Sequence, residues 1–168
     1  LSLRILHVTN FNERHDGRLF FNTGRRINNG LIRLGHSILA FSDRDIQKYY
    51  KNFSDFKGAK TLNEKLRKTC YNYKPDIIML GHADLISSDQ IMELRNDYPN
   101  VKFGQWFLDP LNKKGPDYSR NKNRILDKIR YLDASFVTTS PTVLDFLPKK
   151  TRNFYIPNPS DNSFETLN

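Results

Sequence analysis

The sequence is poor in cysteine, with one thiol in 168 residues. A single cysteine cannot close a disulfide within the chain, so a disulfide-stapled mini-protein is excluded. No apolar run approaches the roughly 18–20 residues that span a bilayer, and the N-terminus lacks the basic and apolar pattern of a signal peptide. We therefore expect a cytoplasmic protein whose length suits one domain of ordinary size.

Several motifs of common functional sites are absent. Neither Gly-x-Gly-x-x-Gly nor the phosphate-binding Gly-x4-Gly-Lys-Ser/Thr occurs, and Gly17 is the single glycine of the first loop. A dinucleotide or nucleoside triphosphate bound in the usual manner is therefore not expected. The four histidines are scattered, with no His-x3-His or Cys-x2-Cys pair, and no Gly-x-Ser-x-Gly elbow appears. We expect no metal and no cofactor.

Positive charge is abundant, because 27 Lys and Arg residues against 18 Asp and Glu give a net charge of +9. The cations gather in two stretches, which comprise Arg14, Arg18, Arg25 and Arg26, and Lys113, Lys114, Arg120, Lys122 and Arg124. Such clusters attract phosphates, anionic glycans, lipid headgroups or nucleic acid. The alternative is a solvated basic face without a partner.

Short apolar runs alternate with stretches of helical spacing along the chain. Strands are predicted at Leu3–Thr9, Ser37–Ser42, Asp76–Gly81, Val101–Phe107, Ala134–Thr138 and Phe154–Ile156. Helices are predicted from about Leu19 to Leu34, from Thr61 to Tyr73, from Ser87 or Ser88 to Tyr98, from Asn121 to Leu132, and briefly after Ser140-Pro141. Six strands alternating with helices predict an α/β fold, a Rossmann-like, three-layer, doubly wound parallel sheet. Residues 1–157 would form this domain, and residues 158–168 would begin an interdomain linker.

The connection between the second and third predicted strands is too apolar for a solvated loop. It contains Ile46, Tyr49, Tyr50, Phe53 and Phe56. We expect this connection to contain a short helix that packs against other apolar residues, without a partner that the sequence identifies.

Ligands of open parallel sheets bind beyond the carboxyl ends of the strands. The first such loop contains His15-Asp16, an imidazole beside a carboxylate that could remove a proton from a hydroxyl. Adjacent side chains rarely face each other, so the carboxylate partner could instead be Asp84 or Asp109. The alternative interpretation makes His15 a surface residue and Asp16 a helix cap.

Two further loops carry candidate binding residues. Trp106 precedes Asp109, and an aromatic ring beside a carboxylate is a common arrangement for holding sugars. The alternatives are that Trp106 belongs to the core and that Asp109 starts a turn. His82 follows a predicted strand, where it could contact a hydroxyl-rich ligand or satisfy a loop carbonyl.

Several segments together resemble the amino-terminal half of a GT-B glycosyltransferase. They are Arg4–Asn10, Asn29–Ser37, Pro75–Ile78, Phe136–Ser140 and Tyr155–Asp161. Trp106 with Asp109-Pro110 is similar to the glycosyltransferases related to spore-maturation proteins.

The resemblance implies one half of a GT-B fold, the acceptor-binding domain of an enzyme that transfers a sugar from a nucleotide-sugar to a hydroxyl. The nucleotide-sugar would bind a second domain that this chain lacks, so the fragment alone would be inactive. The implied catalytic residues are His15 and Asp16. The implied acceptor-binding residues are Asn12, Arg14, Arg18, His82, Asp84, Trp106 and Asp109. The glycine-rich first loop of many relatives is replaced here by Asn12–His15, so donor-phosphate contact from this half is not expected.

The partner expected from this resemblance is an acceptor glycan or another hydroxyl-bearing substrate. The basic charge suits an anionic acceptor, such as an envelope glycan, and a peripheral contact with the inner face of a membrane. Nucleic acid is not expected, because no recognition-helix or RNP-like motif occurs. The rival hypothesis is a non-catalytic α/β binding module for nucleic acid or another anionic ligand, which a steep salt dependence of binding would favour.

Overall fold

The computed structural model describes residues 1–165 and contains a parallel sheet of six strands. The strands are β1 (Arg4–Thr9), β2 (Ser37–Ser42), β3 (Ile77–Gly81), β4 (Lys102–Phe107), β5 (Ala134–Val137) and β6 (Arg152–Tyr155). Their order is β2-β1-β3-β4-β5-β6, and every neighbouring pair is parallel. The Rossmann-like α/β fold predicted from the sequence is thus confirmed.

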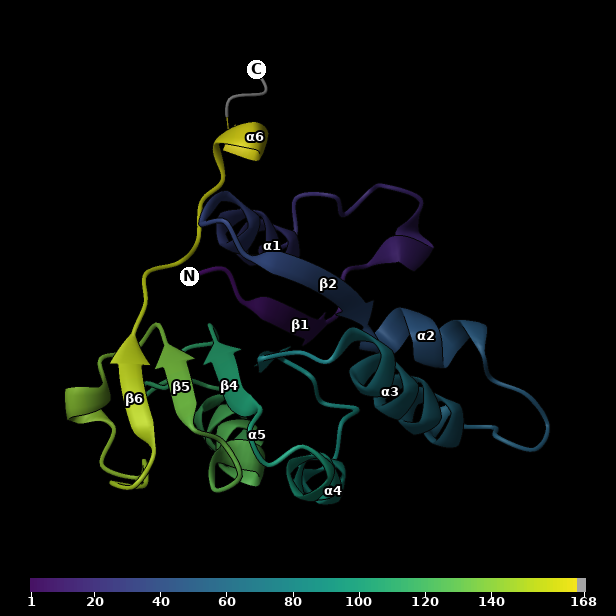
Figure 1. Cartoon of the computed structure of the whole chain (residues 1–168). Coiled ribbons are helices and arrows are strands. Elements are labelled where there is room, and N and C mark those ends of the chain that lie inside the picture. The colour runs from purple at the N-terminus through teal and green to yellow at the C-terminus, as the bar shows by residue number, and fades with distance from the viewer. Residues whose placement is uncertain (166–168) are drawn as a thin grey trace.

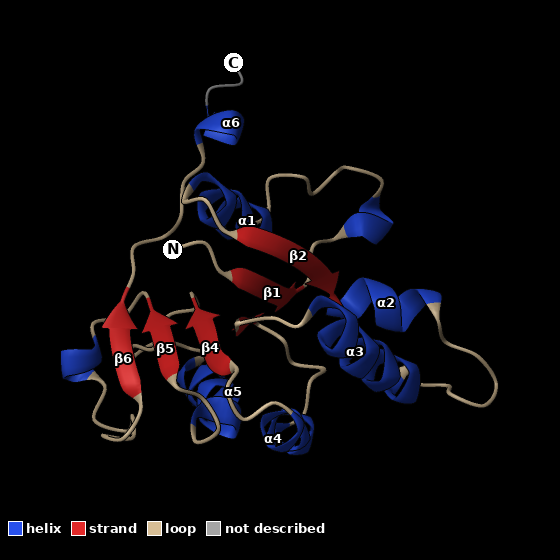
Figure 2. Cartoon of the chain, viewed as in Figure 1, coloured by secondary structure: helices blue, strands red, loops and turns tan. Residues whose placement is uncertain are grey.

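Helices cover both faces of the sheet (Figures 1 and 2). Helix α1 (Thr23–Arg33) lies on one face, and α3 (Ala59–Tyr73), α4 (Ser88–Asp97) and α5 (Tyr118–Ile129) lie on the other. The shorter elements are α2 (Asp43–Tyr49), α6 (Asn162–Glu165) and the 3-10 turns η1 (Glu13–His15) and η2 (Pro141–Val143). In the sheet, β2 lies on one side of β1, and β3 to β6 lie on the other side. Because crossovers between parallel strands are right-handed, α1 and the later helices lie on opposite faces of the sheet.

Helix ends follow local side-chain chemistry. Ser87 caps α4 in a capping box with Gln90, as a serine at this point predicts. The predicted helix starts were wrong at other points, and α5 begins at Tyr118 rather than at Asn121. Helix α1 begins at Thr23, because Asn22 rather than a residue near Leu19 accepts the free N–H of the first turn. Helix α3 begins after Gly58 and not at Thr61, and Ser140-Pro141 leads only into η2.

Two apolar clusters form the core between the sheet and the α3–α5 layer. One joins β1, β3 and β4 to α3 and α4, and includes Leu6, Leu62, Leu66, Ile78 and Phe103. The other joins β4 and β5 to α5, and includes Phe107, Ile125, Ile129 and Val137. Within residues 1–165, no helix is long and apolar enough to cross a bilayer.

The C-terminal segment returns along α1 after leaving β6 (Figure 1). The carboxylate of Asp161 is buried and accepts two hydrogen bonds from Arg33, at 2.9 and 3.0 Å. Arg26 forms an ion pair with Glu165 at 3.0 Å. The division into a domain at 1–157 and a linker at 158–168 stays a prediction, and the last three of those residues lie outside the described part.

Trp106 is the aromatic residue that joins β4 to β3 and β1 on the α1 side of the sheet. The strand register aligns Trp106 with Gly81 and Gly81 with Thr9. A Cβ at position 81 would lie 2.0 Å from Cζ2 of Trp106, so the indole occupies the space of the missing side chain. The indole N–H donates to Nε2 of buried His7 at 3.0 Å. The other ring nitrogen of His7 lies 3.3 Å from Oδ1 of Asn28.

Substitution of Gly81 with alanine is expected to destabilise the fold. The added methyl must displace the buried indole of Trp106, and overpacking of this kind costs about 1–3 kcal/mol. Urea unfolding followed by circular dichroism measures the change. Gly30→Ala is the matched control, because nothing lies within 4 Å of a Cβ there and alanine favours a helix interior by about 0.5–1 kcal/mol. Equal stability of Gly81→Ala and wild type would contradict the packing.

The stability of the fold is also expected to fall as the pH decreases from about 6.5 to 4. Burial lowers the pKa of His7 to about 4, partly opposed by its hydrogen bond to Asn28. Over this range the unfolded chain takes up a proton that the folded chain excludes, which costs up to about 1.4 kcal/mol per pH unit. His7→Gln can still accept a hydrogen bond but does not titrate. The difference in unfolding free energy between wild type and His7→Gln should therefore change with pH, and parallel curves would contradict this role of His7.

Candidate functional site

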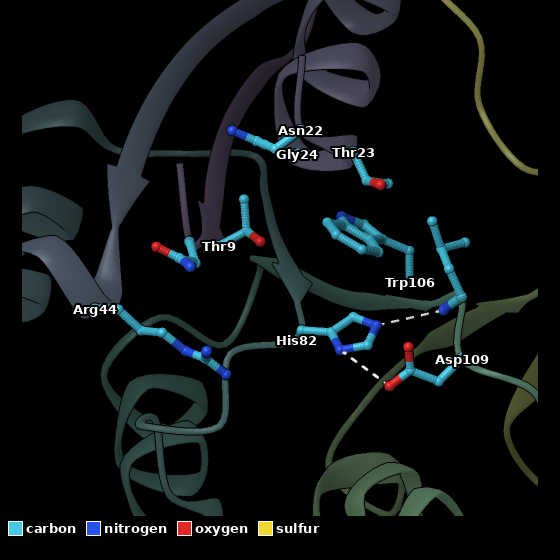
Figure 3. A pocket seen from close by; sticks show the side chains of 10 residues that line it. Thr9, Asn22, Thr23, Gly24, Arg44, His82, Trp106 and Asp109 are labelled. Atoms are coloured by element: carbon cyan, nitrogen blue, oxygen red, sulfur yellow. Dashed lines mark hydrogen bonds and ion pairs between the residues drawn. The ribbon is translucent and has the colours of Figure 1, made fainter. Parts of the chain in front are cut away.

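A pocket of about 270 Å³ lies at the carboxyl ends of β1, β3 and β4 (Figure 3). Its lining residues are Thr9, Asn10, Asn22, Thr23, Gly24, Arg44, His82, Trp106, Leu108 and Asp109. The strand order reverses between β1 and β3, and such a reversal is the usual ligand position in open α/β sheets. Figure 3 shows Arg44 and Trp106 on opposite sides of the space, with Thr9 and His82 between them.

The first turn of α1 supplies hydrogen-bond donors to this pocket. Asn22 accepts the N–H of Arg25 at 3.1 Å, but within residues 1–165 the N–H groups of Thr23 and Gly24 have no acceptor. A Cβ at Gly24 would lie 2.8 Å from Cγ2 of Thr9, so glycine is required for α1 to approach β1 this closely. In the same part of the chain, the hydroxyls of Thr9 and Thr23 make no hydrogen bond. These four groups are available to a ligand.

His82 follows β3 directly and has a left-handed backbone, with φ of 47°. A non-glycine residue in this region is uncommon and is enriched at functional sites. Its ring stacks on Phe107 with centroids 4.8 Å apart. Nε2 lies 3.5 Å from the N–H of Leu108 and Nδ1 lies 3.1 Å from Arg124, so two donors compete for the one acceptor nitrogen of a neutral ring. Burial lowers the pKa of His82, and the neighbouring Asp109 opposes this.

Arg124 connects the strand ends from α5. Its guanidinium donates to Asp84 from Nε at 3.1 Å and from Nη2 at 2.8 Å, and to Asp109 from Nη1 at 2.9 Å. Arg44 also donates to Asp84, at 2.7 Å. Burial alone would raise the pKa of Asp84, but the bonds from Arg124 and Arg44 outweigh it and hold this pKa below its usual value. Two arginines and two carboxylates therefore balance each other around the pocket.

Asp43, directly after β2, is a buried carboxyl group at this edge of the sheet. Its Oδ1 accepts the N–H of Arg44 at 2.8 Å, while Oδ2 is buried without a partner in the described chain. Burial raises the pKa of Asp43 to about 6, and the bond from Arg44 opposes this. Among residues 1–165, no three His, Cys, Asp or Glu side chains gather as a metal ion would require.

The structure brings together some of the predicted site residues. Trp106, His82 and Asp109 line the pocket, and Asp84 is connected to Asp109 through Arg124. For Trp106 the sequence left open a core position and a ligand-binding position. The residue is buried in the core and also lines the pocket.

The predicted residues of the first loop do not line the pocket. His15 belongs to η1 and Asp16 follows it with a left-handed backbone, φ 52°. Arg14 forms an ion pair with Asp45 at 2.7 Å, and Asn12 accepts a hydrogen bond from the side chain of Asn10 at 2.8 Å. Arg18 is exposed on the same loop. The turn of η1 directs this loop toward α2, so the roles predicted for these five residues remain without geometric support.

Sequence reasoning missed Thr9, Thr23, Arg44 and Arg124 as site residues. Thr9 and Arg44 come at or just after a strand end, which is a signal the sequence contains. Arg124 was counted only within a basic cluster, yet acidic partners neutralise much of that charge. Lys113 also pairs, with Asp145 at 2.7 Å. Several cations of the two basic stretches are therefore paired with carboxylates, so neither stretch is a patch made only of unpaired cations.

Comparison with known proteins yields a likeness of fold. No family model and no curated protein matches the sequence. Among solved structures, the chain resembles TubZ of the Clostridium botulinum phage c-st, with a TM-score of 0.50 and 12% identity. The match covers 80% of this chain and 51% of that one, so the chain spans about half the length of TubZ.

The assignment to a GT-B glycosyltransferase is wrong. The structural likeness is to TubZ, and neither sequence comparison supports a glycosyltransferase, a nucleotide-sugar substrate or an acceptor-binding half of such an enzyme. The rival hypothesis of a non-catalytic module for nucleic acid or another anionic ligand has no support from these comparisons either. The segments behind the resemblance are strand ends, a helix end and turns, which parallel α/β domains share whatever they bind. What the comparisons establish for this chain is its fold.

Proposed function

We propose that the pocket between β1 and β3 binds a small, uncharged, hydroxyl-bearing ring compound of about the size of a nucleoside or monosaccharide. One observation carries this proposal: uncommitted hydroxyls and N–H groups on β1 and α1 line the same pocket as the Trp106 indole. In Figure 3, Thr23 lies beside that indole. Few polar groups beside an aromatic ring are typical of small-molecule sites.

The volume supports a small ligand. Pockets for drug-sized molecules usually enclose about 300–1,000 Å³, and this one encloses about 270 Å³. A ring of five or six atoms with its hydroxyls fits that space, whereas a chain of several sugars would extend beyond it. The indole of Trp106 offers an apolar surface to such a ring, and the hydroxyls of Thr9 and Thr23 can donate or accept hydrogen bonds.

The charges around the pocket support an uncharged ligand. The two charged lining residues are already paired, Arg44 with Asp84 at 2.7 Å and Asp109 with Arg124 at 2.9 Å. The lowered pKa of His82 favours the neutral imidazole. Recognition would therefore depend on hydrogen bonds and on contact with the aromatic ring.

Two expectations from the sequence form part of this proposal. Residues 1–157 would be the ligand-binding unit, which is supported by a pocket whose lining residues all fall between Thr9 and Asp109. The protein would act in the cytoplasm, where its one cysteine, the buried Cys70, remains a thiol.

Isothermal titration calorimetry with adenosine, guanosine, ribose and glucose tests the ligand class. We expect saturable binding of at least one of these compounds, accompanied by a change in the fluorescence of Trp106, the one tryptophan of the chain. No saturable binding in the whole set would overturn the proposal. Tighter binding of AMP than of adenosine, or of ribose 5-phosphate than of ribose, would contradict an uncharged ligand.

The variants Thr9→Val and Thr23→Val test the position of the ligand. Each removes one hydroxyl that lines the pocket while keeping the branched shape, so the affinity should fall by about 2- to 10-fold, the value of one hydrogen bond. Thr69→Val, on α3 and away from the pocket, is the matched control and should bind as wild type does. Unchanged affinity in both pocket variants would place the ligand elsewhere.

A further inference from the structure

The loop between α2 and α3 exposes its aromatic side chains. We call residues 48–60, which include the end of α2 and the first residues of α3, the aromatic loop; its aromatic residues are Tyr49, Tyr50, Phe53 and Phe56. The short helix expected in this connection is α2, and the residues beyond it are exposed, Phe53 by 109% and Phe56 by 83%. Only Ile46, within α2, packs against the core. Figure 1 shows the loop extending away from the sheet.

Local hydrogen bonds hold the aromatic loop in this shape. The side chain of Asn52 accepts the N–H groups of Ser54 and Asp55, both at 2.9 Å. The N–H of Gly58 donates to the carbonyl of Asp55 at 2.8 Å, in a left-handed conformation with φ of 66°. Phe53 and Phe56, with Lys51 and Asn52, enclose a shallow hollow of about 310 Å³. The two phenylalanines are thus presented to solvent by an ordered turn.

The charge of the aromatic loop is positive and unpaired. Its four lysines, Lys48, Lys51, Lys57 and Lys60, are all exposed, and none forms an ion pair within residues 1–165. Its one acidic residue, Asp55, accepts the N–H of Thr61 at 2.8 Å, a bond that lowers the pKa of Asp55. This carboxylate is ionised and accepts N–H groups at the start of α3, so the four lysines leave the aromatic loop with a net charge of +3.

We propose that the aromatic loop docks on the surface of an anionic lipid bilayer. Exposed aromatic side chains favour the boundary between headgroups and acyl chains, and lysines beside them favour anionic headgroups. In this arrangement Phe53 and Phe56 enter the boundary region while Lys51 and Lys57 remain among the headgroups. A turn that is already ordered loses little conformational freedom on binding.

The composition of the loop favours a bilayer over nucleic acid. The aromatic loop contains no arginine, which is the residue best suited to bidentate contacts with phosphates and bases. The phenylalanines at its tip have no polar group and gain most from leaving water. The proposal is independent of the ligand pocket, because no residue from 48 to 60 lines that pocket.

Sedimentation with lipid vesicles tests the docking. The full chain should bind vesicles of phosphatidylcholine with 30% phosphatidylserine at low ionic strength, and bind pure phosphatidylcholine vesicles at least tenfold more weakly. The double variant Phe53→Ala/Phe56→Ala should lose at least tenfold in affinity for the anionic vesicles. Lys51→Gln/Lys57→Gln should lose about 20- to 30-fold, since each lysine near the surface contributes about a 5-fold factor.

Two control variants change residues of the same types, phenylalanine and lysine, outside the aromatic loop. Phe154→Ala changes a phenylalanine of β6 that is 46% exposed, and Lys149→Gln/Lys150→Gln changes the net charge by the same amount as the loop variant. Both should bind within about twofold of wild type, and circular dichroism should show that all variants are folded. Equal binding of Phe53→Ala/Phe56→Ala and wild type would overturn the proposal. It would also be overturned by a dimer that this variant abolishes, or by binding of poly(U) through the loop without binding to vesicles.

Discussion

The indole of Trp106 can lie across β3 only because residue 81 has no side chain. From that position it donates a hydrogen bond to the buried His7 and lines the pocket at the carboxyl edge of the sheet. A residue without a side chain is also required at position 24, because a Cβ there would prevent the first turn of α1 from packing against Thr9. Two close approaches, each dependent on a glycine, therefore place α1 against β1 and the indole across β3, and with this they set the shape of the site.

The charged side chains at the strand ends are paired with one another, and this pairing determines the electrostatic character of the pocket. Arg124 binds the carboxylates that follow β3 and β4, and Arg44 adds a second cation from the end of β2. Because these charges are satisfied within the protein, a charged ligand would have to compete with them. Positive side chains that contribute to the net charge of +9 lie outside the pocket, notably on the aromatic loop, where the lysines form no ion pair with a carboxylate. The domain thus separates a neutral pocket from a cationic, aromatic protrusion.

Local pattern was sufficient for much of the fold and for part of the site. Apolar runs located the six strands, and Ser87 marked the start of α4, because both signals depend on near neighbours in sequence. His82 and Asp109 were found from their position after strand ends, and Trp106 was found as an aromatic residue shortly before Asp109. His15 and Asp16 have the same sequence signal but a left-handed turn directs their loop away from the pocket, which no local pattern indicated. The glycosyltransferase resemblance failed for a related reason, since its short segments describe how parallel strands begin and end.

Composition, hydrophobic periodicity and the succession of strands and helices together determined that this chain forms a parallel α/β sheet. Those features act through local backbone preference and burial, which the sequence displays directly. Tertiary structure alone decided that Thr9 and Thr23 share a pocket with Trp106, that Arg124 neutralises Asp84 and Asp109, and that Phe53 remains in water. These outcomes depend on how closely residues from different elements approach, and such distances are set by side-chain packing across the sheet rather than by spacing along the chain.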